Sequence, residues 1–311
     1  GDGPRRGGRG RGDCGGADRG RERQGEGGRV GVSGVGGVAE SLTQGRTFRG
    51  PIRKVPSQAS TAGWWVDLSM ASGTPNPNYY ASAPLVAATF DGNAGIRTGD
   101  DVSPAVKILT SWGLCTPTAG LVGRYWLLDY LLAYPFVDFD DLDPQVMDNS
   151  VSLPRYADGE GVQAMLVAVT PTVGGGTFEF DYVNQDGAAK TSPVQSFSTA
   201  AANIASLPCS QQATAAGGRP FLTLADGDTG IRALTTWRTL SVSGGLGAFV
   251  LVRPLAGHAV REVNSWNVVE WPRQGYGMAV VEDGAYLGMI MNCAATVAAG
   301  TLAGYVRSAW K

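Results

Sequence analysis

The single histidine, His258, sets the first limit on the chemistry available to this chain of 311 residues. A Ser-His-Asp or Cys-His arrangement would have to use it as the base. No GxSxG elbow or other nucleophile motif accompanies it, and no phosphate-binding glycine motif occurs between a strand and a helix. The four cysteines form no CxxC pair, which disfavours zinc. We therefore predict a histidine in a surface loop, no enzymatic activity and no cofactor.

Four aspartates lie close together between residues 138 and 143 and are the best candidates for binding a cation. Calcium prefers several carboxylate and carbonyl oxygens from a flexible loop. The spacing differs from an EF-hand because no glycine stands at the sharp turn and no glutamate closes the site. We predict a solvated acidic loop, or one that faces a basic partner, and leave cation binding open. Its residues are Asp138, Asp140, Asp141 and Asp143.

The motif Asp-Gly-x-x-Gly-Ile-Arg occurs twice, at residues 91–97 and 226–232. Asp-Gly favours a tight turn because glycine adopts positive φ without a steric penalty. We predict a structural hairpin whose isoleucine enters the core while the arginine bridges back to the aspartate. A glycosidase would need two carboxylates flanking its substrate, and nothing identifies such a pair. The predicted turn residues are Asp91, Gly95, Arg97, Asp226, Gly230 and Arg232.

Residues 1–46 form a low-complexity arm rich in glycine and arginine. Residues 1–29 carry eight arginines against five acidic residues, a net charge of +3, whereas the whole chain carries −2. Such an arm buries too little to offset its ordering entropy. Interleaved acids and the lack of aromatic side chains disfavour nucleic-acid binding, so we expect an extended arm that contacts a neighbouring subunit. The candidate contact residues are Arg5, Arg6, Arg9, Arg11 and Arg19.

Four landmarks recur in one order at offsets of about 124 to 136 residues, which indicates duplication of a whole domain. Abundant glycine and proline with only 17% charged residues is typical of short strands joined by tight turns. We predict an all-β protein with two tandem duplicated β-sandwich domains of jelly-roll or Greek-key type. The predicted units are the arm at 1–46, the first domain at 47–186 and the second at 187–311.

The longest apolar stretch, at residues 123–136, is ambiguous between strand and helix. Its shorter counterpart at residues 247–255 is β-branched, which favours a strand at the start and confines any helix to residues 129–134. No apolar run approaches the roughly 20 residues of a membrane span. We expect a protein made in the cytoplasm, with reduced thiols and no membrane partner.

Three features resemble structural proteins of tailed-bacteriophage virions. They are the Asp-Gly-x-x-Gly-Ile-Arg motifs, the Pro-Leu-Ala ending at residues 251–256, and the closing segment from Val280 to Trp310. The likeness covers roughly Phe48 to the C-terminus and excludes the arm. It implies a head decoration or cement protein in the virion: a non-enzymatic β-sandwich that binds the major capsid protein and neighbouring copies of itself, as a homo-oligomer on the outside of the head.

Two alternatives stay open at this point. The first is a tail, neck or head-fibre protein of the same kind of particle. The second is a carbohydrate-binding β-sandwich that uses exposed aromatic rings, with Trp64, Trp65, Tyr79 and Tyr80 as the candidates.

Overall fold

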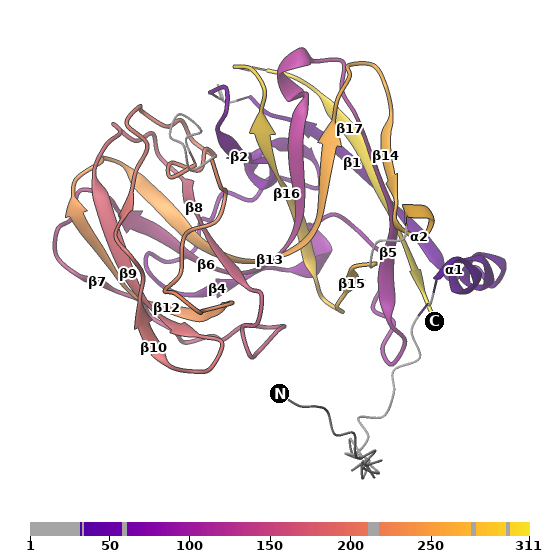
Figure 1. Ribbon diagram of the computed structural model, residues 1–311, viewed down its shortest axis with the longest axis horizontal. Helices are drawn as coiled ribbons and strands as arrows, with labels where there is room; N and C mark the ends of the chain where they lie inside the picture. Colours follow the sequence, from indigo (N-terminus) through magenta and orange to yellow (C-terminus); the bar gives the residue numbers. More distant parts are fainter. Residues whose placement is uncertain (1–31, 33, 58–60, 211–217, 275–277, 297–298) are drawn as a thin grey trace, which may run out of the picture.

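The computed structural model describes residues 32, 34–57, 61–210, 218–274, 278–296 and 299–311. These residues form an almost entirely β structure with three antiparallel sheets, which confirms the all-β prediction. Figure 1 shows two lobes, joined by the long strands β6 (Gly123–Asp138) and β13 (Leu246–Val260).

The central sheet has the strand order β2-β16-β6-β13-β8, and β4 pairs with β6 outside this order. Its other strands are β2 (Trp65–Asp67), β4 (Ala88–Thr89), β8 (Gln163–Ala168) and β16 (Tyr286–Cys293).

Outer sheet I has the order β14-β5-β17-β1-β3, and β15 also pairs with β5. Its strands are β1 (Thr47–Val55), β3 (Ser72–Thr74), β5 (Lys107–Cys115), β14 (Asn267–Glu270), β15 (Val280–Val281) and β17 (Leu302–Trp310).

Outer sheet II has the order β10-β9-β12-β7, and β11 also pairs with β9. Its strands are β7 (Gln145–Val146), β9 (Thr177–Asn184), β10 (Ala189–Thr191), β11 (Gln195–Ser196) and β12 (Ile231–Ser241). The helical segments are α1 (Gly34–Thr43), α2 (Trp271–Gln274) and three 3₁₀ turns at Leu68–Met70, Gly92–Ala94 and Ala119–Leu121.

Both faces of the central sheet are buried, each against a different outer sheet. Along β13, Val250 and Val252 enter the core beside outer sheet I, whereas Phe249 and Leu251 enter the core beside outer sheet II. Successive residues of a strand point to opposite faces, so a strand covered on both sides reads as a continuous apolar run. This explains residues 123–136, which form one strand, and the helix allowed there at residues 129–134 is wrong.

The core beside outer sheet II is rich in aromatic rings that pack around Trp237. Its ring lies parallel to that of Phe178, with centroids 4.3 Å apart, and meets Phe139 and Phe249 at tilted or edge-on angles. These rings come from β9, β12, β13 and the loop after β6, so their packing joins segments distant in sequence.

The two halves of the sequence are interleaved in all three sheets. In outer sheet I, β17 from the second half lies between β5 and β1 from the first. In outer sheet II, β9 from the first half lies between β10 and β12 from the second. The predicted boundary at residues 186/187 therefore needs correction, because 47–186 and 187–311 share their sheets and both cores.

The interleaving preserves the repeat seen in the sequence. Strands β5, β6, β8 and β9 correspond to β12, β13, β16 and β17 at offsets of 123 to 125 residues. At the centre β6 pairs antiparallel with β13, with Tyr130 opposite Val252. The second half places β16 beside β6 and β17 beside β5. The first half places β8 beside β13 and β9 beside β12. A repeat identifies equivalent segments, but the sequence does not reveal which copies pair.

The end of the predicted arm belongs to the folded body. Residues 34–43 form α1, and the Ser41 hydroxyl donates to the carbonyl oxygen of Trp310 at 3.1 Å. Glu40 also pairs with Lys311 at 2.6 Å. The extended arm predicted over 1–46 is thus wrong for its last part. Arg5, Arg6, Arg9, Arg11 and Arg19 lie outside the described residues.

Two smaller observations complete the fold. No helix in the described ranges is long and apolar enough to cross a membrane. Cys115, Cys209 and Cys293 carry thiols, whereas Cys14 lies outside the residues described.

Candidate functional site

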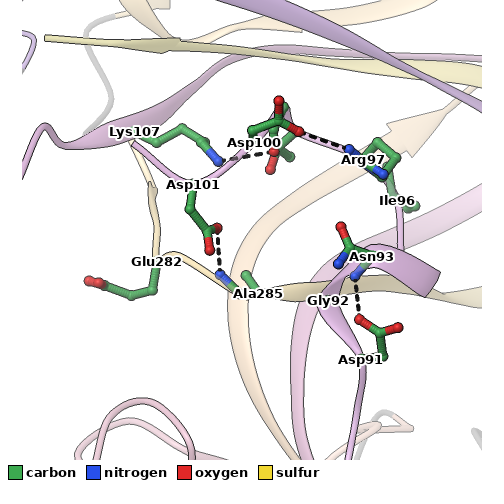
Figure 2. Close-up of a pocket in the computed structure, with 13 residues that line it drawn as sticks. Asp91, Gly92, Asn93, Ile96, Arg97, Asp100, Asp101, Lys107, Glu282 and Ala285 are labelled. Carbon is green, nitrogen blue, oxygen red and sulfur yellow. Dashed lines mark hydrogen bonds and ion pairs between the residues drawn. The ribbon is translucent and has the colours of Figure 1, made fainter. Parts of the chain in front are cut away.

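The first Asp-Gly-x-x-Gly-Ile-Arg motif lines a pocket of about 310 Å³, which we call the motif pocket. Figure 2 shows its walls: the motif itself, the loop leading to β5, and the turn between β15 and β16. Its lining residues are Asp91, Gly92, Asn93, Ile96, Arg97, Thr98, Gly99, Asp100, Asp101, Lys107, Glu282, Gly284 and Ala285.

Carboxylates at the motif pocket hold its loops together. Asp101 accepts a hydrogen bond from the backbone N–H of Gly284 at 2.9 Å, while neighbouring Asp283 accepts from the N–H groups of Val102 and Ser103, each at 3.0 Å. These reciprocal bonds clamp the loop before β5 to the turn before β16. These hydrogen bonds have a structural role, because they join the two halves of the chain.

The arginine of the first motif has a different partner from the one predicted. Arg97 pairs with Asp100 at 3.1 Å, whereas Asp91 accepts from the N–H of Asn93 at 3.0 Å and caps a 3₁₀ turn. Ile96 is buried, as the motif predicted. The bridge from arginine back to the first aspartate is therefore wrong, because the 3₁₀ turn satisfies that aspartate locally.

Lys107 closes the motif pocket from the side of β5. Its residue is only 3% exposed, and its Nζ donates to the carbonyl oxygen of Gly99 at 3.3 Å. Burial lowers the pKa of Lys107, and the negative charges of Asp283, Asp101 and Asp100 oppose that shift. The positive charge of Lys107 therefore offsets the negative charges of the acidic loops around it.

The second motif makes an equivalent contact with the other half of the chain. Gly95 and Gly230 each lie against backbone at or shortly after an Asp-Gly pair of the other half. A Cβ on Gly95 would lie 2.7 Å from the Leu287 nitrogen, and one on Gly230 would lie 1.9 Å from the Gly159 oxygen. Only glycine permits such an approach. Arg232 donates to the carbonyl oxygens of Asp158 and Gln185, so it too does not bridge to Asp226.

The acidic loop after β6 is organised by local backbone bonds. Asp138 and Asp141 accept from the N–H groups two residues ahead, those of Asp140 and Asp143, each at 2.9 Å. Asp140 also accepts from the N–H of Gly244 at 3.0 Å. Asp140, Asp141 and Asp143 are exposed. No cluster of three or more potential metal ligands occurs among the described residues, and a basic partner for this loop stays a prediction.

His258 lies in β13 and not in the surface loop predicted for it. It is partly buried, its ring centroid lies 5.3 Å from that of Trp112, and its Nε2 bonds the Asn267 carbonyl oxygen at 2.9 Å. Since a carbonyl can only accept, Nε2 carries the proton. Burial lowers the pKa of His258. The residue lines a wide groove with Arg124 and Trp126 that the motif search missed, because its parts are distant in sequence.

Asp67 is a fully buried carboxylate at the centre of a polar network. It accepts hydrogen bonds from the Ser69 N–H and hydroxyl at 2.8 Å each, from Tyr130 at 2.7 Å, and from Tyr80. Burial raises the pKa of Asp67, although its hydrogen bonds counteract the shift. A buried carboxylate so fully bonded fixes strands and has no open position for a substrate.

The buried Lys54 should make the stability of the protein depend on pH. It is 2% exposed, and burial lowers its pKa to about 8, with Asp67 opposing the shift. Between pH 8 and 10.5 the folded state has released this proton while the unfolded state still holds it. The free energy of unfolding therefore rises with pH over this range. We expect wild type to gain about 2 kcal/mol relative to Lys54→Met between pH 8 and 9.5. Urea unfolding of both proteins across this pH range checks the prediction. An equal change of stability with pH in the two proteins would contradict it.

The aromatic residues proposed for carbohydrate binding do not form an exposed platform. Trp64, Trp65 and Tyr80 are buried, and Tyr79 alone of the four is exposed, at 55%. The Trp65 indole N–H donates to the Gly218 carbonyl oxygen at 2.6 Å. The sequence shows that these residues are aromatic but not whether they are exposed, and three of the four are buried in the structure.

Comparisons with known proteins show no family for this chain. No protein-family model and no curated protein matches it. Among solved structures it is matched to the crystal structure of the infectious bursal disease virus VP2 subviral particle, with 10% identity, coverage of 85% of this chain and 81% of that chain, and a TM-score of 0.12.

Proposed function

We propose that the protein is a structural protein of a bacteriophage virion, a decoration protein that binds the outside of the head lattice. Its partners would be the major capsid protein and neighbouring copies of itself. The resemblance of residues 48–311 to such proteins supports this proposal, and the arrangement of charged groups supports a structural role.

The observation that carries the proposal is the use of the buried ionisable side chains. Among the described Asp, Glu, Lys and Arg residues, the buried ones are Lys54, Asp67, Lys107 and Asp129. Each bonds to backbone or side-chain groups that hold strands and loops in place. An active site keeps some of its perturbed groups directed at a substrate position, and here these groups serve the scaffold.

The basic arm provides the test of assembly. The deletion must end before α1, since α1 is bonded to the last strand. We expect removal of residues 1–31 to leave the melting temperature of the body unchanged and to reduce incorporation into particles. Exposed ion pairs contribute roughly 0–1 kcal/mol each and are screened by salt, so binding should also weaken with added salt.

The control for this experiment is a full-length chain in which Arg5, Arg6, Arg9, Arg11 and Arg19 are replaced by glutamine. It keeps the length of the arm and changes the net charge of residues 1–29 from +3 to −2. If both variants are incorporated as well as wild type, the arm has no part in assembly. A tail, neck or head-fibre position would appear as a copy number far below that of the major capsid protein.

A further inference from the structure

A wide groove lies where the ends of β6, β13 and β14 meet, and we call it the basic groove. It encloses about 650 Å³ and is lined by Arg124, Tyr125, Trp126, Gly257, His258, Ala259, Arg261, Asn267, Val268 and Val269. Two arginines and no carboxylate line it, although the chain as a whole carries a net charge of −2. Both arginines are exposed, and neither forms an ion pair with another described residue.

Trp126 forms an aromatic wall of this groove. It lies opposite Gly257 in the pairing of β6 with β13, and a Cβ on Gly257 would lie 3.8 Å from the indole ring. One side of the ring is thus supported by the glycine backbone, and Phe221 meets it edge-on with centroids 6.2 Å apart. Trp126 remains partly exposed, so the ring is held in place and still accessible.

The polar floor of the groove is already fixed by internal bonds. The side chain of Asn267 donates to the Ser265 carbonyl oxygen at 3.1 Å and accepts from the Arg261 N–H at 3.2 Å. The His258 ring donates to the Asn267 carbonyl oxygen at 2.9 Å. Preformed polar groups reduce the ordering cost of binding.

We propose that the basic groove binds an acidic saccharide, with the ring of one sugar on Trp126 and its carboxylate or phosphate on Arg124 and Arg261. A guanidinium matches both anions with paired hydrogen bonds. Tryptophan offers a broad apolar face to the ring. Single-stranded nucleic acid would need successive aromatic platforms along a basic track. Of the aromatic rings that line this groove, Tyr125 is buried and His258 is bonded to Asn267, which leaves Trp126. This site is independent of the virion proposal and would stand if that proposal failed.

The test uses the full chain and calorimetric titration with tetragalacturonate, glucose 1-phosphate and neutral maltotetraose. We expect saturable binding of tetragalacturonate with a Kd on the order of 1 mM or tighter, and no measurable binding of maltotetraose. Trp126→Ala, and the double variant Arg124→Gln with Arg261→Gln, should each weaken it by about tenfold or more. Binding of glucose 1-phosphate would extend the site to phosphorylated sugars, and its absence would restrict the site to carboxylates.

Arg307→Gln and Tyr79→Ala are the matched controls, because both residues are exposed outside the groove. Both should bind like wild type, and unchanged thermal unfolding of the groove variants would show that they fold. Four results would overturn the proposal: no binding of either acidic sugar, equal binding of maltotetraose, tighter binding of an oligothymidylate that competes for the groove, or equal losses in the controls.

Discussion

Separate expression of residues 1–186 and 187–311 is expected to yield two fragments that do not fold alone and that regain native structure when mixed. In the intact protein β9 pairs with β12 across this cut, and β1 pairs with β17. Each fragment alone would expose half of both cores and leave the long strands β6 and β13 without each other. Mixing restores all three sheets, so recovery should depend on fragment concentration.

Circular dichroism and amide proton dispersion measure this outcome directly. Each fragment should lack a cooperative thermal transition, and an equimolar mixture should show one. A chain cut inside the Asp186-Gly187 turn by a protease, without separation of its parts, is the control and should stay folded. A cooperative transition in either isolated fragment would contradict the interleaved arrangement and favour tandem domains.

Arg155→Met is expected to destabilise the protein by about 3–5 kcal/mol at pH 7, because it leaves a buried carboxylate unpaired. Asp129 is 0% exposed and accepts from Nη2 and Nε of Arg155 at 2.6 Å and 2.8 Å. The same arginine donates to the carbonyl oxygen of Gly284 at 2.8 Å. The residue therefore joins β6 to the turn before β16, across the two halves of the sequence.

The pH dependence of this variant follows from the carboxyl group. Burial already raises the pKa of Asp129 to about 6 in the presence of Arg155, which opposes the shift. Without the arginine the folded-state pKa rises further above the unfolded value. Stability is then retained at low pH and lost as pH rises through the folded-state pKa, so the variant should recover part of its loss near pH 5.

Urea unfolding at pH 5 and pH 7.5 tests both statements. Adding Asp129→Asn to Arg155→Met should also restore part of the loss, since it removes the buried charge. Arg238→Met is the comparison, because the Arg238 and Asp181 side chains are 32% and 23% exposed, and it should cost about 1 kcal/mol or less. Equal losses in the Arg155 and Arg238 variants at both pH values would show that burial of Asp129 is not the cause.

The sequence predicted the elements of this fold better than their partners. The repeated landmarks correctly indicated equivalent strands in the two halves, and Ile96 and Ile231 are buried, as the repeated motif predicted. Strand pairing could not be read, because hydrophobic periodicity is a local property. Either copy of a repeated strand satisfies the same pattern, so β17 could have paired within its own half.

For the candidate sites too, the sequence identified some residues and missed others. The turn glycines Gly95 and Gly230 could be identified from the motif, since close backbone approach requires glycine. The basic groove could not, because Arg124 and Arg261 meet only after β6 has paired with β13. One signal was present in the sequence: Gly257-His258 in an otherwise apolar segment marks a place where a strand leaves room for a neighbouring ring.

If the proposal holds, the chain is encoded by a phage, and its quantification in purified particles of that phage tests the proposed function most directly. Mass spectrometry with isotope-labelled peptides from this chain and from the major capsid protein gives their molar ratio. A head decoration protein should be present at a ratio comparable with the capsid protein, and it should be removed from intact heads by conditions that leave the capsid shell closed. Its absence from particles that are otherwise complete and infectious would contradict the proposal.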